Sequence, residues 1–178
     1  MNGDIERIIY DEKSLAGVVE RLAGQINADY QGKELVVIGI LKGSAVFLAD
    51  LFRKLECSCT LDFMAASSYG SGTVSKGKIN ITKDLTADIR GKNVLIVEDI
   101  LDTGNTLSYL KEYLQGFDPE SVKICVLFDK PSRRTKDISA DYIGYTIDDL
   151  FLVGYGLDYD EKYRNLPYVG LLKSEIYQ

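Results

Sequence analysis

The residues best suited to chemistry lie close together between positions 94 and 107, where the sequence reads VLIVEDILDTGNTL. Two adjacent acids, Glu98 and Asp99, follow four apolar residues and are expected to end a buried strand. A third acid, Asp102, precedes small and hydroxyl-bearing residues that are expected to open a helix. Backbone amides at a helix N-terminus bind anions, and the helix dipole favours negative charge there. The segment therefore predicts a phosphate site.

The three acids need their own explanation, because carboxylates repel phosphate. They are better suited to ribose hydroxyls, to Mg²⁺ or to a proton. The chain contains no G-x-x-x-x-G-K-[ST] motif, and no G-x-G-x-x-G follows a strand, so the two best-known nucleotide loops are excluded. An ordinary helix cap with a glycine in its turn remains the alternative interpretation of residues 102–106.

Two lysines also follow predicted strands. Lys42 and Gly43 come after the apolar segment 34–41, and Lys130 comes after the apolar segment 122–128. Ligands of α/β proteins gather at the carboxyl ends of parallel strands, so both lysines are candidate ligand contacts. Each could instead be a solvated side chain in a turn.

Composition excludes several kinds of site and partner. The chain of 178 residues has no histidine, and its three cysteines form no C-x-x-C pair, so the usual zinc sites and histidine-dependent triads are excluded. A general base must therefore be a carboxylate, a lysine or a tyrosine. The formal net charge of -6 argues against binding to nucleic acids or membrane surfaces.

The N-terminal sequence MNGDIERIIY is acidic where a signal peptide would be basic. Apolar runs such as residues 35–38 are far too short to span a bilayer. With few cysteines and no export signal, the expected location is the cytoplasm.

Hydrophobic periodicity predicts the elements that position these residues. Helices are expected over 14–30, over 45–55 and after residue 102, and strands over 34–41, 59–65, 79–85, 94–97, 122–128, 142–147, 151–155 and 168–172. The Ser- and Gly-rich segment 67–78 is expected to be a mobile loop. Strands that alternate with helices predict an α/β fold with a mainly parallel sheet, and no boundary divides residues 1–178 into more than one domain.

Segment 94–107 resembles the phosphoribosyl-pyrophosphate (PRPP) signature of type I phosphoribosyltransferases, in their hypoxanthine-guanine branch. The resemblance continues with a pyrophosphate loop at 41–44 (LKGS), a mobile catalytic loop at Ser68 and Tyr69, a purine-binding lysine at Lys130 and a base- and metal-binding segment at 151–164 (FLVGYGLDYDEKYR). It implies a central, mainly parallel sheet flanked by helices, with a small hood formed by the C-terminal segment.

The resemblance also implies a role for each candidate residue. The groups expected to bind the 5'-phosphate of PRPP are Thr103, Gly104, Asn105 and Thr106. Those expected at the pyrophosphate are Leu41, Lys42 and Gly43, often through a non-proline cis peptide, together with Arg164. Glu98 and Asp99 would face the ribose directly or through Mg²⁺, and Asp158 would hold a second Mg²⁺. Phe151 would stack on the purine, the backbone of Leu152 and Asp158 would meet its N1 and N2 edge, and Lys130 would donate to its 6-oxo group.

The implied activity is purine salvage. The 5-phosphoribosyl group of PRPP moves to N9 of hypoxanthine or guanine, which gives IMP or GMP and pyrophosphate, and Asp102 would take or share the proton at purine N7. Family members are homodimers or homotetramers.

The alternatives are a non-catalytic PRPP-sensing regulator on the same fold, an enzyme preferring xanthine, and enzymes for adenine, orotate or uracil. Lys130 favours a 6-oxo acceptor over adenine, whose 6-amino group is a donor.

Overall fold

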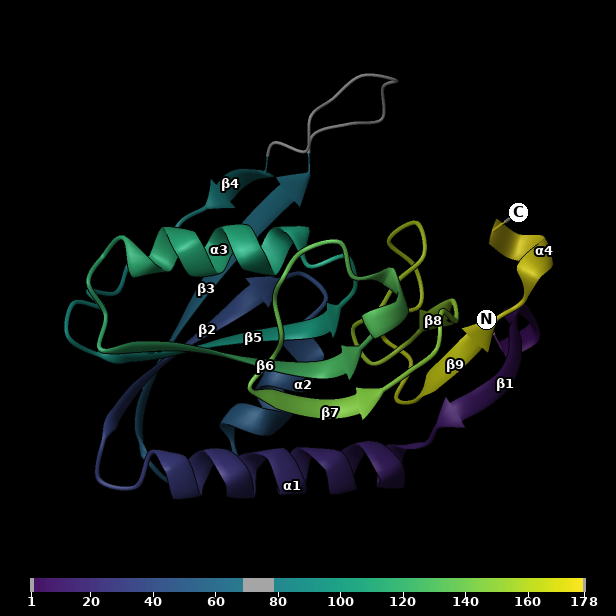
Figure 1. The fold of residues 1–178 in the computed structure, drawn as a ribbon. Helices are drawn as coiled ribbons and strands as arrows, with labels where there is room; N and C mark the ends of the chain where they lie inside the picture. The colour runs from purple at the N-terminus through teal and green to yellow at the C-terminus, as the bar shows by residue number, and fades with distance from the viewer. Residues whose placement is uncertain (1, 69–78, 178) are drawn as a thin grey trace.

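The structure is a computed structural model that describes residues 2–68 and 79–177, and within them the strands form two sheets (Figure 1). The larger sheet has six strands in the order β4-β3-β2-β5-β6-β7, and the smaller has three in the order β1-β9-β8. The strands are β1 (Ile5–Tyr10), β2 (Glu34–Leu41), β3 (Ser58–Ser68), β4 (Ile79–Lys83), β5 (Asn93–Leu101), β6 (Ser121–Asp129), β7 (Tyr142–Thr146), β8 (Leu152–Val153) and β9 (Val169–Leu172). The helices are η1 (Asn2–Asp4), α1 (Glu12–Asp29), α2 (Ala45–Phe52), α3 (Asn105–Gln115), η2 (Pro131–Arg133) and α4 (Ser174–Tyr177).

The larger sheet is parallel except at one edge. Strands β3, β2, β5, β6 and β7 run parallel, and β4 pairs antiparallel with β3. Helices α1 and α2 cover one face and α3 covers the other, so the inner strands are buried on both sides (Figure 1). This is why β2, with the sequence ELVVIGIL, is an apolar run without alternation. The expected α/β fold with a mainly parallel sheet is confirmed, and β4 is the edge strand that the sequence suggested.

Helix α1 shows why the periodic pattern was informative. Leu15, Val18, Leu22 and Ile26 recur at helical spacing and are all buried in the core. The helix begins at Glu12 rather than at Ser14, because the side chain of Asp11 caps it by accepting a hydrogen bond of 2.8 Å from the amide of Ser14.

The expectation that Glu98 and Asp99 end their strand is wrong. Strand β5 continues to Leu101, because its ladder with β6 runs on to the pairs Ile100–Phe128 and Leu101–Asp129. Pairing with a neighbouring strand here outweighs the local polarity of the two acids. The consequence for function is that both acids belong to the rigid sheet and not to a loop.

Other boundaries also differ from the expected ones. Helix α2 ends at Phe52, and the strand expected over 151–155 is reduced to the two residues of β8. Strand β3 extends to Ser68, so the expected loop 67–78 begins later than the composition suggested. The remaining loop residues 69–78, including Tyr69, lie outside the described residues.

The three-stranded sheet, here called the hood, combines both ends of the chain. The C-terminal strands β8 and β9 were expected, but β1 was not, and it pairs antiparallel with β9 (Figure 1). The hood has a small core of its own, made of Val153, Tyr163, Leu166 and Leu172. The predicted C-terminal hood is therefore present, with an N-terminal strand added to it.

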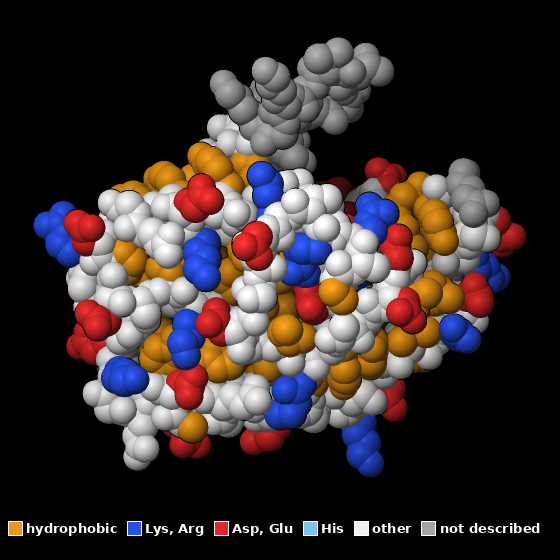
Figure 2. All heavy atoms as spheres, viewed as in Figure 1, with side chains coloured by type: hydrophobic (Ala, Val, Ile, Leu, Met, Phe, Trp, Pro, Cys, Tyr) orange, Lys and Arg blue, Asp and Glu red, His pale blue; other side chains and the backbone are white. Residues whose placement is uncertain are grey.

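Acidic and basic side chains are interspersed over the face shown in Figure 2, rather than gathered into a field of one sign. Extended nucleic-acid sites are basic patches, and this face does not show one. Within the described residues, no helix combines the length and the apolar composition that crossing a bilayer requires.

Candidate functional site

A cavity of about 340 Å³ opens where strands β2 and β5 end at the same edge of the sheet. Its lining includes most of the residues that the segment 94–107 predicted. The lining residues are Ile40, Leu41, Ala66, Glu98, Asp99, Ile100, Leu101, Asp102, Thr103, Gly104, Thr106 and Leu107. The prediction missed the apolar wall formed by Ile40, Ala66, Ile100 and Leu107, since such residues have no chemical signature in a sequence.

The turn from Asp102 to α3 has the geometry of an anion site. Gly104 is the N-cap of α3 and adopts a left-handed conformation with φ 86°. A Cβ at this position would lie 2.6 Å from Ile138 Cγ2, so both the backbone angle and the space require glycine. The first amides of a helix have no partner within it, and Thr103, Gly104 and Thr106 line the cavity. Asn105 is exposed and does not line it.

Glu98, which is partly buried, and Asp99, which is buried, form an acid pair on the cavity wall. Burial, and then the neighbouring Asp99 carboxylate, raise the pKa of Glu98 well above its usual range. Burial also raises the pKa of Asp99, an effect that is opposed in part by hydrogen bonds with Glu98 and the amide of Ile100 and by the positive charge of Arg164. Two buried carboxylates side by side favour a bound proton or cation.

The loop that follows β2 packs directly on this acid pair. The peptide bond between Leu41 and Lys42 is cis, as the family resemblance implied. A Cβ on Gly43 would overlap Asp99 Oδ2, so the loop backbone touches the carboxylate. Ser44 anchors the loop by donating a hydrogen bond of 2.6 Å to the carbonyl oxygen of Ile40.

The segment after β8 completes this side of the site. A Cβ on Gly156 would overlap the carbonyl oxygen of Gly43, so the two backbones are in contact. Arg164 donates to the carbonyl oxygen of Gly156 at 2.8 Å and forms an ion pair of 2.8 Å with Asp158 Oδ1. Lys42, Gly43, Asp158 and Arg164 are thus brought together, as predicted.

Two details of this cluster were not predicted. Lys42 Nζ forms an ion pair of 2.9 Å with Glu161, an acid to which the sequence assigned no role. The Nε atom of Arg164 is buried and has no hydrogen-bond partner among the described residues, so a donor is left for an anion. The Asp158 carboxylate pairs with Arg164 and accepts a hydrogen bond of 2.9 Å from the amide of Glu161.

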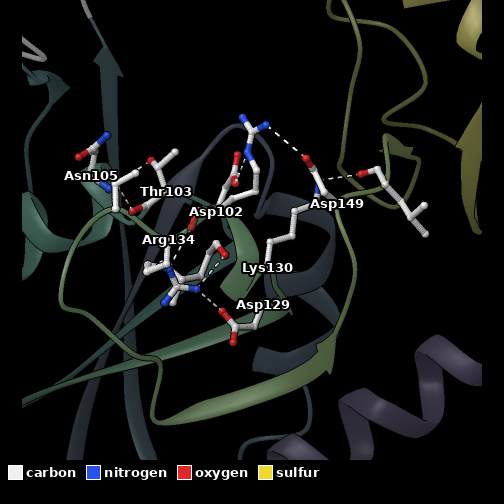
Figure 3. A network of polar contacts seen from close by, with 11 residues as sticks. Asp102, Thr103, Asn105, Asp129, Lys130, Arg134 and Asp149 are labelled. Atoms are coloured by element: carbon white, nitrogen blue, oxygen red, sulfur yellow. Dashed lines mark hydrogen bonds and ion pairs between the residues drawn. The ribbon is translucent and has the colours of Figure 1, made fainter.

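A chain of alternating charges links Asp102 to Lys130 through Arg133 and Asp149 (Figure 3). Lys130 Nζ donates to the carbonyl oxygen of Leu150 at 2.6 Å and lies 3.3 Å from Asp149 Oδ1. Arg133 lies 3.3 Å from Asp149 Oδ2 and 3.4 Å from Asp102 Oδ1. The last contact lacks hydrogen-bond geometry, and Asp102 Oδ1 has no hydrogen-bond partner in the part of the chain described.

Phe151 and Leu152 belong to the hood rather than to the cavity lining. The ring of Phe151 stacks on that of Tyr177, with centroids 4.5 Å apart and planes 16° apart, and meets Tyr159 edge-on at 5.5 Å. Leu152 is buried in β8. Tyr177 therefore covers one face of Phe151. Ser68 ends β3, and its side chain and all of Tyr69 lie outside the described residues.

No pattern in the sequence assigned a role to Arg133, Arg134, Asp149 or Glu161, which connect the expected site residues to one another. Two consecutive arginines after Lys130 were the one available signal. Charged side chains of this kind are common on solvated surfaces, so the pattern alone does not distinguish them.

Residues 7–160 match the model of the phosphoribosyl transferase domain family. Over 177 residues the chain is 49% identical to the hypoxanthine-guanine phosphoribosyltransferase of Staphylococcus aureus, with 99% of both chains covered. It is 46% identical to the bifunctional protein TilS/HprT of Listeria innocua, where the match covers 99% of this chain. The chain spans about a quarter, 27%, of the length of that bifunctional relative.

Solved structures agree with these similarities. A crystal structure of a hypoxanthine phosphoribosyltransferase from Staphylococcus aureus superposes with a TM-score of 0.96 at 49% identity, covering 100% of this chain and 97% of that one. A hypoxanthine phosphoribosyltransferase from Trypanosoma cruzi, a lysine-to-arginine mutant in a ternary substrates complex, has a TM-score of 0.93 at 38% identity, covering 99% and 100%.

Proposed function

Because this chain belongs to the phosphoribosyltransferase family, we propose that it transfers the 5-phosphoribosyl group of PRPP to N9 of hypoxanthine or guanine, in purine salvage. The products are IMP or GMP and pyrophosphate. One observation carries the proposal: the N-terminal turn of α3, the acid pair Glu98 and Asp99, and Asp102 line the same cavity. Residues 1–178 act as a single domain in this proposal.

The 5'-phosphate is held by the turn before α3. Its oxygens accept hydrogen bonds from the backbone amides and hydroxyls of residues 103–106, where the helix dipole adds to the attraction. Glu98 and Asp99 face the ribose, whose hydroxyl groups are donors suited to buried carboxylates. Because both acids belong to β5, the sugar is oriented by a rigid element.

Mg²⁺ is the cofactor of this proposal, and the acid pair fits it. Mg²⁺ usually keeps several waters and binds one or two carboxylates plus substrate phosphates. Within the described residues no group of three or more acid, histidine or cysteine side chains is arranged to hold a metal ion by itself. Glu98 and Asp99 would hold the ion together with PRPP, and Asp158 would join a second ion once Arg164 releases it. Bound Mg²⁺ supplies charge neutralisation at the pyrophosphate.

Asp102 acts on the purine proton. Its Oδ1 atom forms an ion pair of 3.4 Å with Arg133 but accepts no hydrogen bond in the described part of the chain, which leaves a lone pair for the proton at purine N7. General base catalysis by a positioned side chain contributes about 10²- to 10⁴-fold. The bond from the anomeric carbon to pyrophosphate breaks as the bond to N9 forms.

Negative charge that develops on the departing pyrophosphate is stabilised by Lys42, the amide of Gly43 and Arg164. Arg164 carries the Nε donor that has no partner among the described residues, and the Lys42 side chain is 69% exposed and forms a surface ion pair with Glu161. Surface ion pairs contribute little free energy, so a phosphate group can displace Glu161 from Lys42.

The purine lies between the cavity and the hood. Lys130 donates to the 6-oxo group with the remaining hydrogen of an ammonium group that already contacts Leu150 and Asp149. Phe151 stacks on the purine ring, and the backbone near Leu152 and Asp158 reads the N1 and N2 edge. Ser68 and Tyr69 begin the catalytic loop in this proposal.

A cytoplasmic location and an assembly of two or four copies complete the proposal. Cys57, Cys59 and Cys125 are free thiols, which fits a reducing compartment. Light scattering on the purified protein measures the number of copies in the assembly.

The proposal is tested by incubating the protein with PRPP and Mg²⁺ and with hypoxanthine, guanine, xanthine, adenine, orotate or uracil in turn. Nucleotide and pyrophosphate are expected from hypoxanthine and guanine. Product from neither base would refute the proposal, and product from adenine alone would contradict the role given to Lys130. Binding of PRPP without turnover of any base would identify a PRPP-sensing regulator instead.

A further inference from the structure

We propose that Arg134 is a positioning residue, which fixes the phosphate-binding turn from behind so that its amides face the 5'-phosphate. This inference rests on the proposed function. Arg134 does not line the cavity, and none of the roles assigned above includes it. It lies after η2, and it donates hydrogen bonds to the backbone carbonyl groups of Leu101 and Asp102 (Figure 3).

Four of the five N–H donors of the Arg134 guanidinium group have acceptors in the protein. Its Nε donates to the carbonyl oxygen of Asp102 at 2.9 Å, and Nη2 donates to that of Leu101 at 3.2 Å. Its Nη1 donates to the carbonyl oxygen of Ile138 at 2.6 Å, and Nη2 also pairs with the carboxylate of Asp129. A planar fork of five donors can serve four acceptors at once, which an ammonium group cannot do with the same geometry.

Thr135 holds the next carbonyl group of the turn. Both its amide, at 3.0 Å, and its hydroxyl, at 3.2 Å, donate to the carbonyl oxygen of Thr103. Arg134 and Thr135 therefore donate hydrogen bonds to three consecutive carbonyl groups, those of residues 101–103. Arg134, Thr135 and Asp129 are here called the brace. In a trans peptide the N–H points away from the C=O of the same plane. Because the carbonyl groups of residues 101–103 point toward the brace, the N–H groups of residues 102–104 point away from it, toward the cavity.

The aliphatic stem of Arg134 supports the turn by contact as well. A Cβ on Gly104 would lie 3.0 Å from Arg134 Cδ, so the stem lies directly under the glycine that caps α3. A side chain at position 104 would therefore displace Arg134 from this place.

The brace is built from buried charges. The side chains of Arg134 and Asp129 are 15% and 13% exposed, so their pair is shielded from solvent and from competing ions. Asp129 is the last residue of β6, and its backbone pairs with Leu101 of β5. The turn is in this way attached to the rigid end of the sheet. A displacement of about 1 Å at such a site can cost 10²-fold in rate.

The test uses Arg134→Lys, which keeps a positive charge beside Asp129 but loses the fork. Affinities for ribose 5-phosphate and for Mg²⁺-pyrophosphate are measured by calorimetry. We expect the dissociation constant of ribose 5-phosphate to rise about 10- to 100-fold and that of pyrophosphate to change less than about 2-fold. The reason is that pyrophosphate is held by Lys42, Gly43 and Arg164, which Arg134 does not contact.

Two controls separate positioning from general damage. Arg90→Lys changes an exposed arginine before the opposite end of β5 and is expected to leave both affinities unchanged. The double variant Arg134→Gln with Asp129→Asn removes both buried charges together, so it avoids an unpaired carboxylate if Arg134→Lys does not fold. It is expected to show the same selective loss, and thermal unfolding verifies that each variant is folded.

Equal losses of ribose 5-phosphate and pyrophosphate affinity would overturn the proposal, because they would indicate a merely structural role for Arg134. Unchanged affinity for ribose 5-phosphate would overturn it as well. If the wild-type protein binds ribose 5-phosphate and forms nucleotide, and Arg134→Lys binds ribose 5-phosphate equally well, the positioning role of Arg134 is refuted and the proposed function is not. A wild-type protein that neither binds it nor forms nucleotide would refute the proposed function, and the brace with it.

Discussion

At the carboxyl ends of the strands of the large sheet, here called the edge, most of the residues that line the cavity belong to β2 and β5 or to the turn that follows β5. In the hood, the residues expected to face the purine lie on turns and on a strand of two residues. The edge rests on two large hydrophobic clusters, one on each face of the sheet, whereas the hood has a small core around Val153 and Leu172.

This difference separates two tasks. The edge offers backbone amides and buried acids in fixed positions, which suits the sugar, the phosphate and the reacting atoms. The hood offers side chains such as Phe151, held by ring contacts with Tyr177 and Tyr159, which suits recognition of a flat base. Changes at the edge should therefore affect rate and stability most, and changes in the hood should affect base affinity.

The largest effect is expected at Asp102, which lies at the edge. Asp102→Asn keeps the size of the side chain but removes the basic oxygen, so kcat should fall about 10²- to 10⁴-fold. The affinity for PRPP should change less than about 3-fold, because the backbone of the turn is retained. Steady-state kinetics and PRPP titration measure the two quantities. Equal losses in both would mean that Asp102 positions the turn and does not accept a proton.

The next effect is expected at Gly43, where the edge meets the segment after β8. In Gly43→Ala the new methyl group would overlap Asp99 Oδ2, so the loop or the acid must move. We expect kcat/KM, measured by steady-state kinetics, to fall about 10²-fold, because the pyrophosphate loop and the acid pair lose their relative position.

The matched control for Gly43→Ala is Gly24→Ala. Gly24 is exposed in α1, and a Cβ there meets nothing within 4 Å. This variant should keep full activity and be more stable by about 0.5–1 kcal/mol, because alanine is the better helix former. Full activity in Gly43→Ala would contradict the contact between loop and acid.

A smaller effect, on stability alone, is expected at Asp62 in β3 of the large sheet. Burial raises the pKa of this carboxyl, but hydrogen bonds from the amides of Thr86, Ala87 and Phe63 outweigh it and hold the pKa far below the usual range. A lowered folded-state pKa stabilises the protein above the unfolded value of about 3.9, and this stabilisation is lost as the pH falls below it. Asp62→Asn should lower the free energy of unfolding at pH 7 by about 1–3 kcal/mol.

Denaturant titrations between pH 7 and pH 2 test this prediction. The difference between wild type and Asp62→Asn should shrink as the pH falls below about 4, since the wild-type carboxyl then begins to lose its advantage. A difference that stays constant over this range would show that ionisation of Asp62 does not stabilise the sheet.

The smallest effect is expected in the hood. Phe151→Leu keeps an apolar side chain but loses ring stacking, a contribution of about 0.5–1.5 kcal/mol, so the KM for hypoxanthine should rise about 2- to 12-fold. The KM for PRPP and the unfolding temperature should hardly change. Phe117→Leu, at an exposed phenylalanine beyond α3, serves as the control. A larger effect on PRPP than on the purine would contradict the division between edge and hood.

Local pattern was enough to predict the edge. Strand β2 was predicted at its observed bounds because both of its faces are buried, which leaves an uninterrupted apolar run. Glu98 and Asp99 were wrongly predicted to end their strand. Pairing with β6 extends β5 to Leu101, and a local sequence pattern contains no information about such pairing. Strand β1 was missed for the same reason, since IERIIY pairs with residues at the far end of the chain.

The candidate site was predictable to a similar degree. Residues that belong to a short motif, such as Asp102 and Gly104, were selected from the sequence, and in the structure they line one cavity. Arg134 was not, because its partners are carbonyl oxygens, and every residue type supplies that acceptor. Supporting contacts of this kind are set by backbone geometry and leave no pattern in the sequence.

The division between edge and hood is tested most directly by a crystal structure of the protein with IMP. The account predicts phosphate oxygens within about 2.7–3.2 Å of the amides of residues 103–106, with the 6-oxo group at Lys130 Nζ and the purine on the open face of Phe151. A phosphate group bound instead at Lys42 and Gly43, with the purine away from Lys130, would contradict it.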